Sequence, residues 1–172
     1  MKRVLFFCGA LLLATAASAQ VTKESVPGIV NFSKVETTVA CAGATTPAAL
    51  VEVKKMGYNS VVNLRTAAEA GAQIEEEAAA AKAAGINYIH LPFNAQMPDP
   101  MLVDNFLKAI NDKANQPAFI HCASANRAAA LWMVKRIAVD KWDVARATEE
   151  ATALGLTNPA LKAFAIEQAQ KH

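Results

Sequence analysis

The chain has 172 residues, a formal net charge of +2 and 53% hydrophobic residues, a fraction inflated by alanine. This length fits one domain, and a nearly neutral chain gives no support to nucleic acid or an anionic membrane as a partner. Beyond the amino terminus, no stretch is long and apolar enough to cross a bilayer. Composition therefore argues against a membrane-embedded protein and against a polybasic nucleic-acid binder.

The first 19 residues have the pattern of a secretory signal peptide. The chain begins with Met-Lys-Arg, residues 4–13 are apolar, and residues 17–19 form a small-residue cleavage site, Ala-Ser-Ala. Cleavage after Ala19 would remove two basic residues and leave 15 basic against 15 acidic side chains. We expect a mature protein that is periplasmic or secreted and has no membrane partner.

The segment that follows differs from the rest of the chain. Residues 20–36 are polar and mixed, and Pro27-Gly28 is a turn signal. We expect this lead-in segment to have little regular structure. The folded domain is expected to span residues 37–172.

Short β-branched or apolar runs alternate with helical patterns along this domain. In chain order, we expect a strand at 37–41, a helix at 45–56, a strand at 59–64, a helix at 69–84, a strand at 86–91, a helix at 101–114, a strand at 118–120 and helices at 128–139, 143–154 and 158–170. This alternation predicts an α/β fold. The expected architecture is a three-layer sandwich with a central, mostly parallel sheet of about four to five strands flanked by helices.

The most informative stretch joins the last expected strand to a helix and reads His121-Cys122-Ala123-Ser124-Ala125-Asn126-Arg127. A loop that enters a helix directs backbone N–H groups into one small space, and the helix dipole adds positive potential there. Cys122 would be stabilised in that space as a thiolate nucleophile. Arg127 has a planar guanidinium that can bind two phosphate oxygens. A structural thiol beside a surface arginine is the alternative interpretation.

The pattern His121-Cys122-x4-Arg127 resembles the signature loop of the cysteine-dependent phosphatases, the protein-tyrosine and dual-specificity group. The closest resemblance is to a bacterial branch related to dual-specificity phosphatases with this shortened loop. GATTPAAL at 43–50, where that branch has Gly-Gln-Pro followed by a helix, and SVVNLR at 60–65 support it. The resemblance covers about residues 39–156 and implies hydrolysis of a phosphate monoester through a phosphocysteine, without metal or cofactor.

The resemblance also suggests roles for the rest of the loop. The backbone amides of Ala123, Ser124, Ala125 and Asn126 would hold the equatorial phosphate oxygens together with the arginine. His121 precedes the cysteine and should point away from the pocket, so we expect it to tune the thiolate through hydrogen bonds.

Three departures from the family pattern keep two other functions open. Four residues rather than the usual five separate Cys122 from Arg127. Ala125 replaces the family's mid-loop glycine, and Ala128 replaces the hydroxyl residue that follows the arginine in the family. A rhodanese-like sulfurtransferase also has four residues before its arginine and would carry a persulfide on Cys122. If position 125 needs a positive φ, alanine costs about 1 kcal/mol there relative to glycine. A catalytically decayed anion-binding or interaction domain is therefore the other alternative.

Two further charged residues are site candidates. In the family, a loop after the third strand supplies an aspartic general acid, which makes Asp99 the candidate here, with Asp104 as a second carboxylate within reach. Asp99 also has the position of a helix N-cap. Arg65 follows the second strand at the sheet edge where α/β proteins bind ligands. It can either help to hold an anion or pair with Glu69 on the surface.

The mature chain would keep two cysteines, Cys41 and Cys122. In an oxidising compartment they can pair, or Cys41 can be buried and unreactive. The consecutive residues Glu75, Glu76 and Glu77 predict a solvated helix face rather than a metal site. We expect a phosphorylated small molecule or protein as substrate, and sugar phosphates and nucleotides both fit the sequence.

Overall fold

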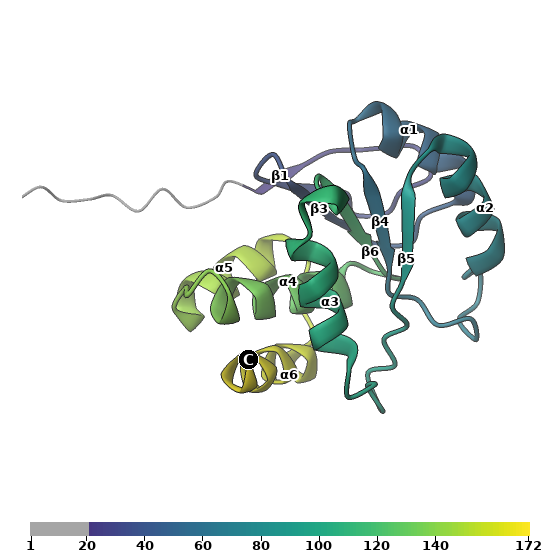
Figure 1. The fold of residues 1–172 in the computed structure, drawn as a ribbon. Coiled ribbons are helices and arrows are strands. Elements are labelled where there is room, and N and C mark those ends of the chain that lie inside the picture. Colours follow the sequence, from purple (N-terminus) through teal and green to yellow (C-terminus); the bar gives the residue numbers. More distant parts are fainter. Residues whose placement is uncertain (1–20) are drawn as a thin grey trace, which may run out of the picture.

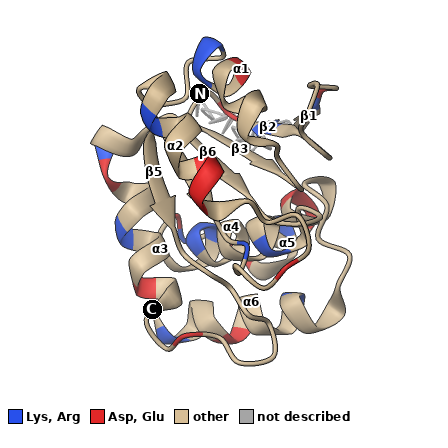
Figure 2. Cartoon of the chain, turned by 90° about the vertical axis from the view of Figure 1, so that its right-hand side faces the viewer, with Lys and Arg blue, Asp and Glu red and all other residues tan. Residues whose placement is uncertain are grey.

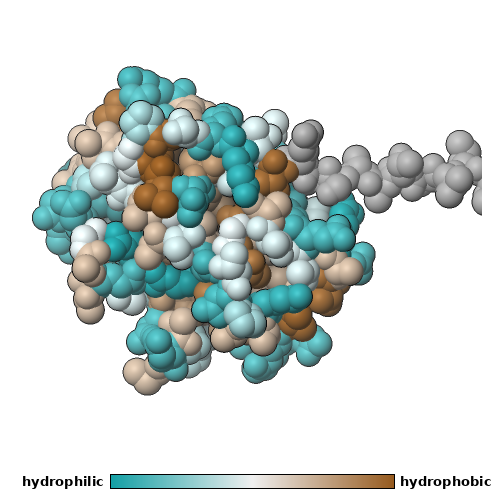
Figure 3. Space-filling view, turned by 180° about the vertical axis from the view of Figure 1, so that it is seen from behind, coloured by the Kyte–Doolittle hydropathy of each residue, from teal (hydrophilic) through white to brown (hydrophobic). Residues whose placement is uncertain are grey.

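The structure is a computed structural model that describes residues 21–172 (Figure 1). The predicted signal peptide lies outside the described residues, so its removal stays a prediction. None of the described helices combines the length and the apolar content that a membrane span requires. Hydrophobic residues on the face seen in Figure 3 form small spots among hydrophilic ones.

Six strands form one sheet with the order β1-β2-β3-β6-β4-β5. They are β1 (Val21–Lys23), β2 (Ser33–Val35), β3 (Val39–Ala42), β4 (Ser60–Asn63), β5 (Asn87–His90) and β6 (Ala118–His121). Strands β3, β6, β4 and β5 pair in parallel, whereas β1 and β2 add antiparallel to the edge at β3. The mostly parallel sheet expected from the sequence is confirmed, with six strands instead of four or five.

The two additional strands lie in the segment for which we expected little regular structure. β2 pairs with β3, and β1 pairs with β2 with Val21 opposite Val35. The side chains of Phe32 and Val35 are buried and anchor the segment to the sheet. Each strand has only three residues, too few for a recognisable alternation, and the partner that orders them is the distant edge of β3.

Helices cover both faces of the sheet, which makes three layers (Figure 1). The helical elements are η1 (Pro47–Ala49), α1 (Leu50–Lys55), α2 (Ile74–Ala84), α3 (Leu102–Asn111), η2 (Lys113–Asn115), α4 (Asn126–Ala138), α5 (Val144–Ala153) and α6 (Pro159–Lys171). Side chains alternate along the strands, so Phe119 and Val61 pack with α1 and α2. Ile120 and Val62 pack in a second core with α3 to α6.

The second helix begins five residues later than expected. Residues from Glu69 onward have helix-forming composition, but α2 begins at Ile74. The chain before it instead forms a loop in which the Glu69 carboxylate accepts hydrogen bonds from the backbone N–H of Thr66 and from two arginine side chains. These contacts hold Glu69 outside the helix, so tertiary interactions override its helix propensity.

A buried polar cluster ties α2 to the end of β6. Oε1 of Glu77 lies 2.6 Å from Nε2 of His121, and Oε2 of Glu77 accepts a hydrogen bond of 3.0 Å from Nδ2 of Asn63. Glu77 and His121 are both fully buried, whereas Glu75 and Glu76 are exposed. The expected solvated helix face is therefore wrong for Glu77, because position 77 faces the sheet.

Replacing Glu77 with alanine should lower the free energy of unfolding by about 3 kcal/mol, because His121 and Asn63 would lose a buried hydrogen-bond partner. Urea-induced unfolding followed by circular dichroism measures this loss. Glu76→Ala, one position along on the exposed side, is the matched control and should change stability by less than about 0.5 kcal/mol. Equal losses in the two variants would contradict a buried supporting role for Glu77.

Candidate active site

The candidate site lies where β6 ends and α4 begins, at the carboxyl edge of the parallel strands. Cys122 is the first residue after β6, and its backbone N–H donates to the carbonyl of Ala42 in the neighbouring β3. Its side chain has no exposed surface and lies in the core on the α4 side of the sheet. The sheet therefore fixes the cysteine at the base of the loop.

The loop after Cys122 presents unpaired backbone donors at the start of α4. In the part of the chain that the structure describes, the backbone N–H groups of residues 126–128 donate to no protein acceptor, whereas a bridge between Gly43 and Ser124 ties the start of the loop to the end of β3 and directs the N–H of Ala125 toward the carbonyl of Ala42. The helix ladder starts with the N–H of Ala129, which donates to the carbonyl of Ala125. Free N–H groups at a helix N-terminus are the usual donors for a phosphate or another anion.

Ala125 occupies the position before α4 with φ 76° and ψ −17°, in the left-handed region. The positive φ considered from the sequence is therefore present, and alanine there costs about 1 kcal/mol relative to glycine. Gly155 approaches this residue closely, since a Cβ added at Gly155 would lie 3.3 Å from the Cβ of Ala125. Packing against the α5–α6 connection holds the loop in this conformation.

Arg127 projects from the first turn of α4 and is held by oxygen atoms of three other segments. Nη1 donates to Oε1 of Glu69 and Nη2 donates to Oε2, both at 2.7 Å. Nη1 also donates to the carbonyls of Leu64 and Phe93, at 3.2 and 2.8 Å. Burial alone would lower the pKa of Arg127, but Glu69 and the nearby Cys122 raise it. The guanidinium is thus charged and fixed beside the cysteine.

Glu69 is the functional residue that sequence reasoning missed, because it was considered only as a partner for Arg65. Burial by itself would raise the pKa of Glu69, but hydrogen bonds from Arg127 and the N–H of Thr66, together with the arginine charge, lower it to about 2. An ionised carboxylate therefore orients Arg127. Its only signal in the sequence was its position four residues after Arg65.

Arg65 is buried and supports this carboxylate from behind. Its Nε lies 3.4 Å from Oε2 of Glu69, and its terminal nitrogens donate to the carbonyls of Ala70 and Gly71 at 2.6 and 2.7 Å. Pairing with Glu69 is thus correct, but Arg65 is not a surface residue. A direct contact between Arg65 and a bound anion stays a prediction.

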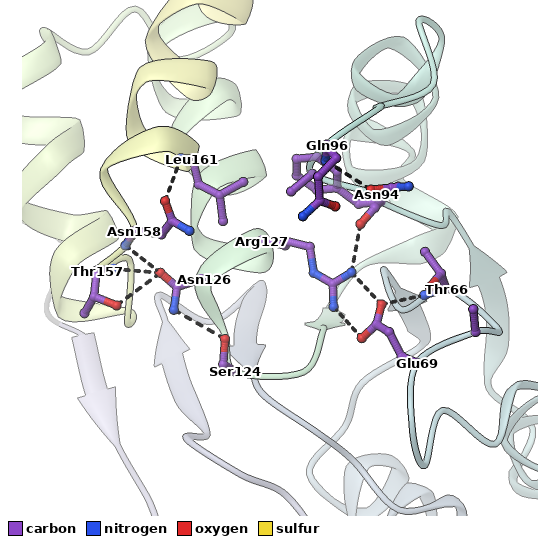
Figure 4. A pocket seen from close by; sticks show the side chains of 13 residues that line it. Thr66, Glu69, Asn94, Gln96, Ser124, Asn126, Arg127, Thr157, Asn158 and Leu161 are labelled. Carbon is purple, nitrogen blue, oxygen red and sulfur yellow. Dashed lines mark hydrogen bonds and ion pairs between the residues drawn. The ribbon is translucent and has the colours of Figure 1, made fainter.

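A hollow of about 590 Å³ opens in front of Arg127 (Figure 4). Ser124, Asn126 and Arg127 of the predicted loop line it together with Thr66, Ala68, Glu69, Phe93, Asn94, Ala95, Gln96, Thr157, Asn158 and Leu161. The side chain of Asn126 joins the loop to the α5–α6 connection, because Oδ1 accepts from the N–H groups of Thr157 and Asn158. Nδ2 of Asn126 lies 3.3 Å from Oγ of Ser124.

The carboxylates considered as general acids lie outside this lining. Asp99 is exposed, and its Oδ1 accepts a hydrogen bond of 2.7 Å from the N–H of Met101 in the turn before α3. The N-cap position that the sequence suggested for Asp99 is instead occupied by Met101. Asp104 pairs with His172 at 3.1 Å. Among the residues that line the hollow, Glu69 is the one carboxylate, and it is bound to Arg127. A general-acid role for Asp99 remains a prediction.

The other predicted residues have more distant positions. His121 points toward Glu77, away from the hollow, and its Nδ1 has no hydrogen-bond partner in the described region. Ala123 is exposed on the loop. Cys41 and Cys122 are both free thiols and form no disulfide with each other. Burial of the Cys41 side chain, and to a smaller extent the nearby Cys122, raises the pKa of Cys41, which favours a protonated, unreactive thiol. No cluster of metal-ligating side chains is found among residues 21–172.

A family model for the phosphatase-like domain of beta-lactamase hydrolase-like proteins matches residues 31–140. Among solved structures, a DUF442 protein from Shewanella putrefaciens CN-32 is 20% identical, with a TM-score of 0.70 over 84% of this chain and 92% of that chain. TpbA from P. aeruginosa is 18% identical, with a TM-score of 0.66 over 91% and 92%. TpbA has also been crystallised with phosphotyrosine.

The core catalytic domain of the PP-IP phosphatase SIW14 from S. cerevisiae, in complex with citrate, is 16% identical, with a TM-score of 0.67 over 86% of this chain and 93% of that chain. No curated protein matches the sequence. The structural likeness confirms the cysteine-phosphatase-like fold expected from the sequence.

Replacing Ala125 with glycine should raise the free energy of unfolding by up to about 1 kcal/mol, because glycine adopts the observed positive φ without strain. Urea unfolding of the two proteins measures the difference. Ala128→Gly, three residues along in the regular helix, should instead destabilise the protein by about 1 kcal/mol. Destabilisation by both glycines would show that the loop is not strained at Ala125.

The lowered pKa of Glu69 makes its contribution to stability depend on pH. That contribution is complete above the ordinary pKa of 4.5 and is lost as the pH falls toward the folded-state pKa of about 2. Glu69→Gln should therefore lower the free energy of unfolding by on the order of 2 kcal/mol at neutral pH and by much less near pH 3. Urea unfolding at both pH values tests this expectation. A loss that does not change with pH would argue against an ionised Glu69 as the cause.

Proposed function

Because the chain belongs to the phosphatase-like domain family of beta-lactamase hydrolase-like proteins, we propose that it is an exported cysteine-dependent phosphatase that cleaves a phosphate monoester through a phosphocysteine. One observation carries this proposal. Cys122 and a charged Arg127, which Glu69 holds in place, lie at the two ends of a loop with free backbone N–H groups. A thiolate nucleophile and a phosphate-binding guanidinium are the groups that this chemistry needs.

In the first step the sulfur of Cys122 attacks phosphorus, an S–P bond forms and the bond from phosphorus to the ester oxygen breaks. The free N–H groups of the loop and the guanidinium of Arg127 stabilise the charge on the three non-bridging oxygens. The departing alcohol oxygen takes up a proton, for which Asp99 is the proposed donor. Water then attacks phosphorus, the S–P bond breaks, and inorganic phosphate leaves with the thiolate restored.

Two features of the structure bear on how this cycle begins. Cys122 has no exposed surface, so the loop must part for phosphorus to reach the sulfur. The carboxylate of Asp99 accepts a hydrogen bond from the N–H of Met101 in the turn before α3, so it has to leave this N–H before it can donate a proton.

Export is part of the proposal and rests on the sequence of residues 1–19. The mature enzyme would act in the periplasm or outside the cell on a phosphorylated small molecule or protein. Phosphotyrosine bound to TpbA and the activity named for SIW14 support a phosphorylated substrate of one of these kinds. The full burial of Cys122 supports a thiol that survives in an oxidising compartment.

Sulfur transfer is the second candidate function, and the loop length favours it. Four residues separate Cys122 from Arg127, which suits a sulfur atom better than a tetrahedral phosphate. Cys122 would then take a sulfane sulfur as a persulfide and pass it to a nucleophilic acceptor. The third candidate, an anion-binding or interaction domain without turnover, is favoured by Ala125 and Ala128 in place of the family's glycine and hydroxyl residue.

Mature protein kept reduced should hydrolyse p-nitrophenyl phosphate, and Cys122→Ser should lower kcat by at least about 1,000-fold because it removes the nucleophile. Arg127→Ala should lower kcat by about 100-fold or more. Asp99→Asn should lower kcat by about 100-fold on an alkyl phosphate, whose leaving group needs a proton. Asp104→Asn and Cys41→Ser are the controls and should remain active. Release of p-nitrophenol and of inorganic phosphate gives the rates.

The alternatives predict other outcomes of the same experiment. Absence of aryl phosphate hydrolysis together with Cys122-dependent sulfur transfer from thiosulfate to cyanide would identify a sulfurtransferase. Absence of both activities, with phosphate binding that requires Arg127, would identify an anion-binding domain. Hydrolysis that survives in Cys122→Ser would overturn the phosphocysteine mechanism.

A further inference from the structure

The hollow in front of Arg127 has little charge beyond what one phosphate requires. Arg127 is its one cationic lining residue in the described chain, and Glu69 is its one anionic lining residue. Counted with Arg65 behind Glu69, two guanidiniums share one carboxylate, which leaves a single positive charge. Lys and Arg elsewhere are spread over several elements rather than gathered at one place (Figure 2). A second phosphate would find no further cation in the lining, so the site fits a monophosphate.

The apolar part of the hollow is also limited. Phe93 is its one aromatic lining residue, but its side chain is only 1% exposed and its ring packs against Phe164 with centroids 5.1 Å apart. Leu161 is 6% exposed. Because favourable aryl binding scales with the apolar area that is buried, these two side chains offer little to a phosphotyrosine ring.

Uncharged polar side chains make up most of the remaining lining and lie on both sides of Arg127 (Figure 4). Asn126, Thr157 and Asn158 are on one side, whereas Asn94, Gln96 and Thr66 are on the other. Protein contacts occupy only some of their polar atoms.

On the Asn158 side, the amide oxygen accepts from the N–H groups of Ala160 and Leu161, which leaves the amide NH2 for a ligand. On the opposite side, the amide oxygen of Asn94 accepts from the N–H of Gln96, and its NH2 is likewise left over. Within the described region, the side chain of Gln96 makes no hydrogen bond, so both its donor and its acceptor are available.

Hydroxyl groups are the partners that such a mixed set suits, because each hydroxyl both donates and accepts. The volume of about 590 Å³ lies within the range of small-molecule sites, about 300–1,000 Å³. We propose that the alcohol part of the substrate is polyhydroxylated and uncharged, so that the substrate is a sugar or polyol monophosphate. Amide side chains on both sides of Arg127 bind its hydroxyls. This inference rests on the proposed phosphatase activity and specifies its substrate class.

The test compares kcat/KM of the mature wild-type enzyme on three probes: glucose 6-phosphate, glucose 1,6-bisphosphate and phosphotyrosine. Glucose 6-phosphate should exceed each of the other two by at least about tenfold, as expected for a few hydrogen bonds of ordinary strength. Preference for the bisphosphate or for phosphotyrosine would overturn the inference.

Gln96 supplies the matched variant because its side chain is exposed and has no described protein partner. Gln96→Ala should lower kcat/KM for glucose 6-phosphate by about 3- to 10-fold more than it lowers that for p-nitrophenyl phosphate. Gln170→Ala, an exposed glutamine near the end of α6, should leave both values unchanged. Equal losses on both substrates in Gln96→Ala would contradict the binding of sugar hydroxyls by the amide side chains beside Arg127.

A binding measurement separates this inference from the proposed activity. Calorimetry with Cys122→Ser should rank glucose 6-phosphate above phosphotyrosine and glucose 1,6-bisphosphate, whether or not the wild-type enzyme turns over. Hydrolysis of p-nitrophenyl phosphate without that ranking would overturn the substrate class alone. The ranking without any hydrolysis would overturn the phosphatase activity and leave a sugar-phosphate binding site.

Discussion

The candidate site depends on the ion pair between Arg127 and Glu69. Two hydrogen bonds of 2.7 Å fix the guanidinium in a plane, and the same carboxylate contacts Arg65 behind it. Through this contact, the loop before α2 and the first turn of α4 become one unit. Because one carboxylate faces two guanidiniums, a positive charge remains for an anion. Without Glu69, two arginines would repel each other in a half-buried place.

The loop between Cys122 and α4 is held from a second side by the connection between α5 and α6. Oδ1 of Asn126 accepts hydrogen bonds from two backbone N–H groups of that connection, and Gly155 lies against Ala125. These contacts sustain a backbone conformation that alanine does not favour by itself, which is how strain persists at a functional loop. The connection between the two carboxy-terminal helices therefore positions the loop.

At the end of β6, the two faces of the sheet carry residues with different roles. On one face, Cys122 lies against the α4 core and next to Arg127. On the other face, the preceding residue His121 contacts Glu77 of α2. Alternation along β6 produces this division, since consecutive side chains of a strand point to opposite sides. The proposed nucleophile Cys122 and the buried contact of His121 are therefore adjacent in sequence but lie on opposite faces of the sheet.

The sequence by itself determined the α/β class, the parallel strands, most helices and the Cys122–Arg127 loop, because caps, periodicity and a short motif are written in consecutive residues. Only the tertiary structure decided that Glu69 pairs with Arg127, 58 residues away, and that Glu77 meets His121, 44 residues away. It also decided the late start of α2 and the pairing of β1 and β2. Such contacts depend on which segments the fold brings together, and local helix and strand propensities do not encode this.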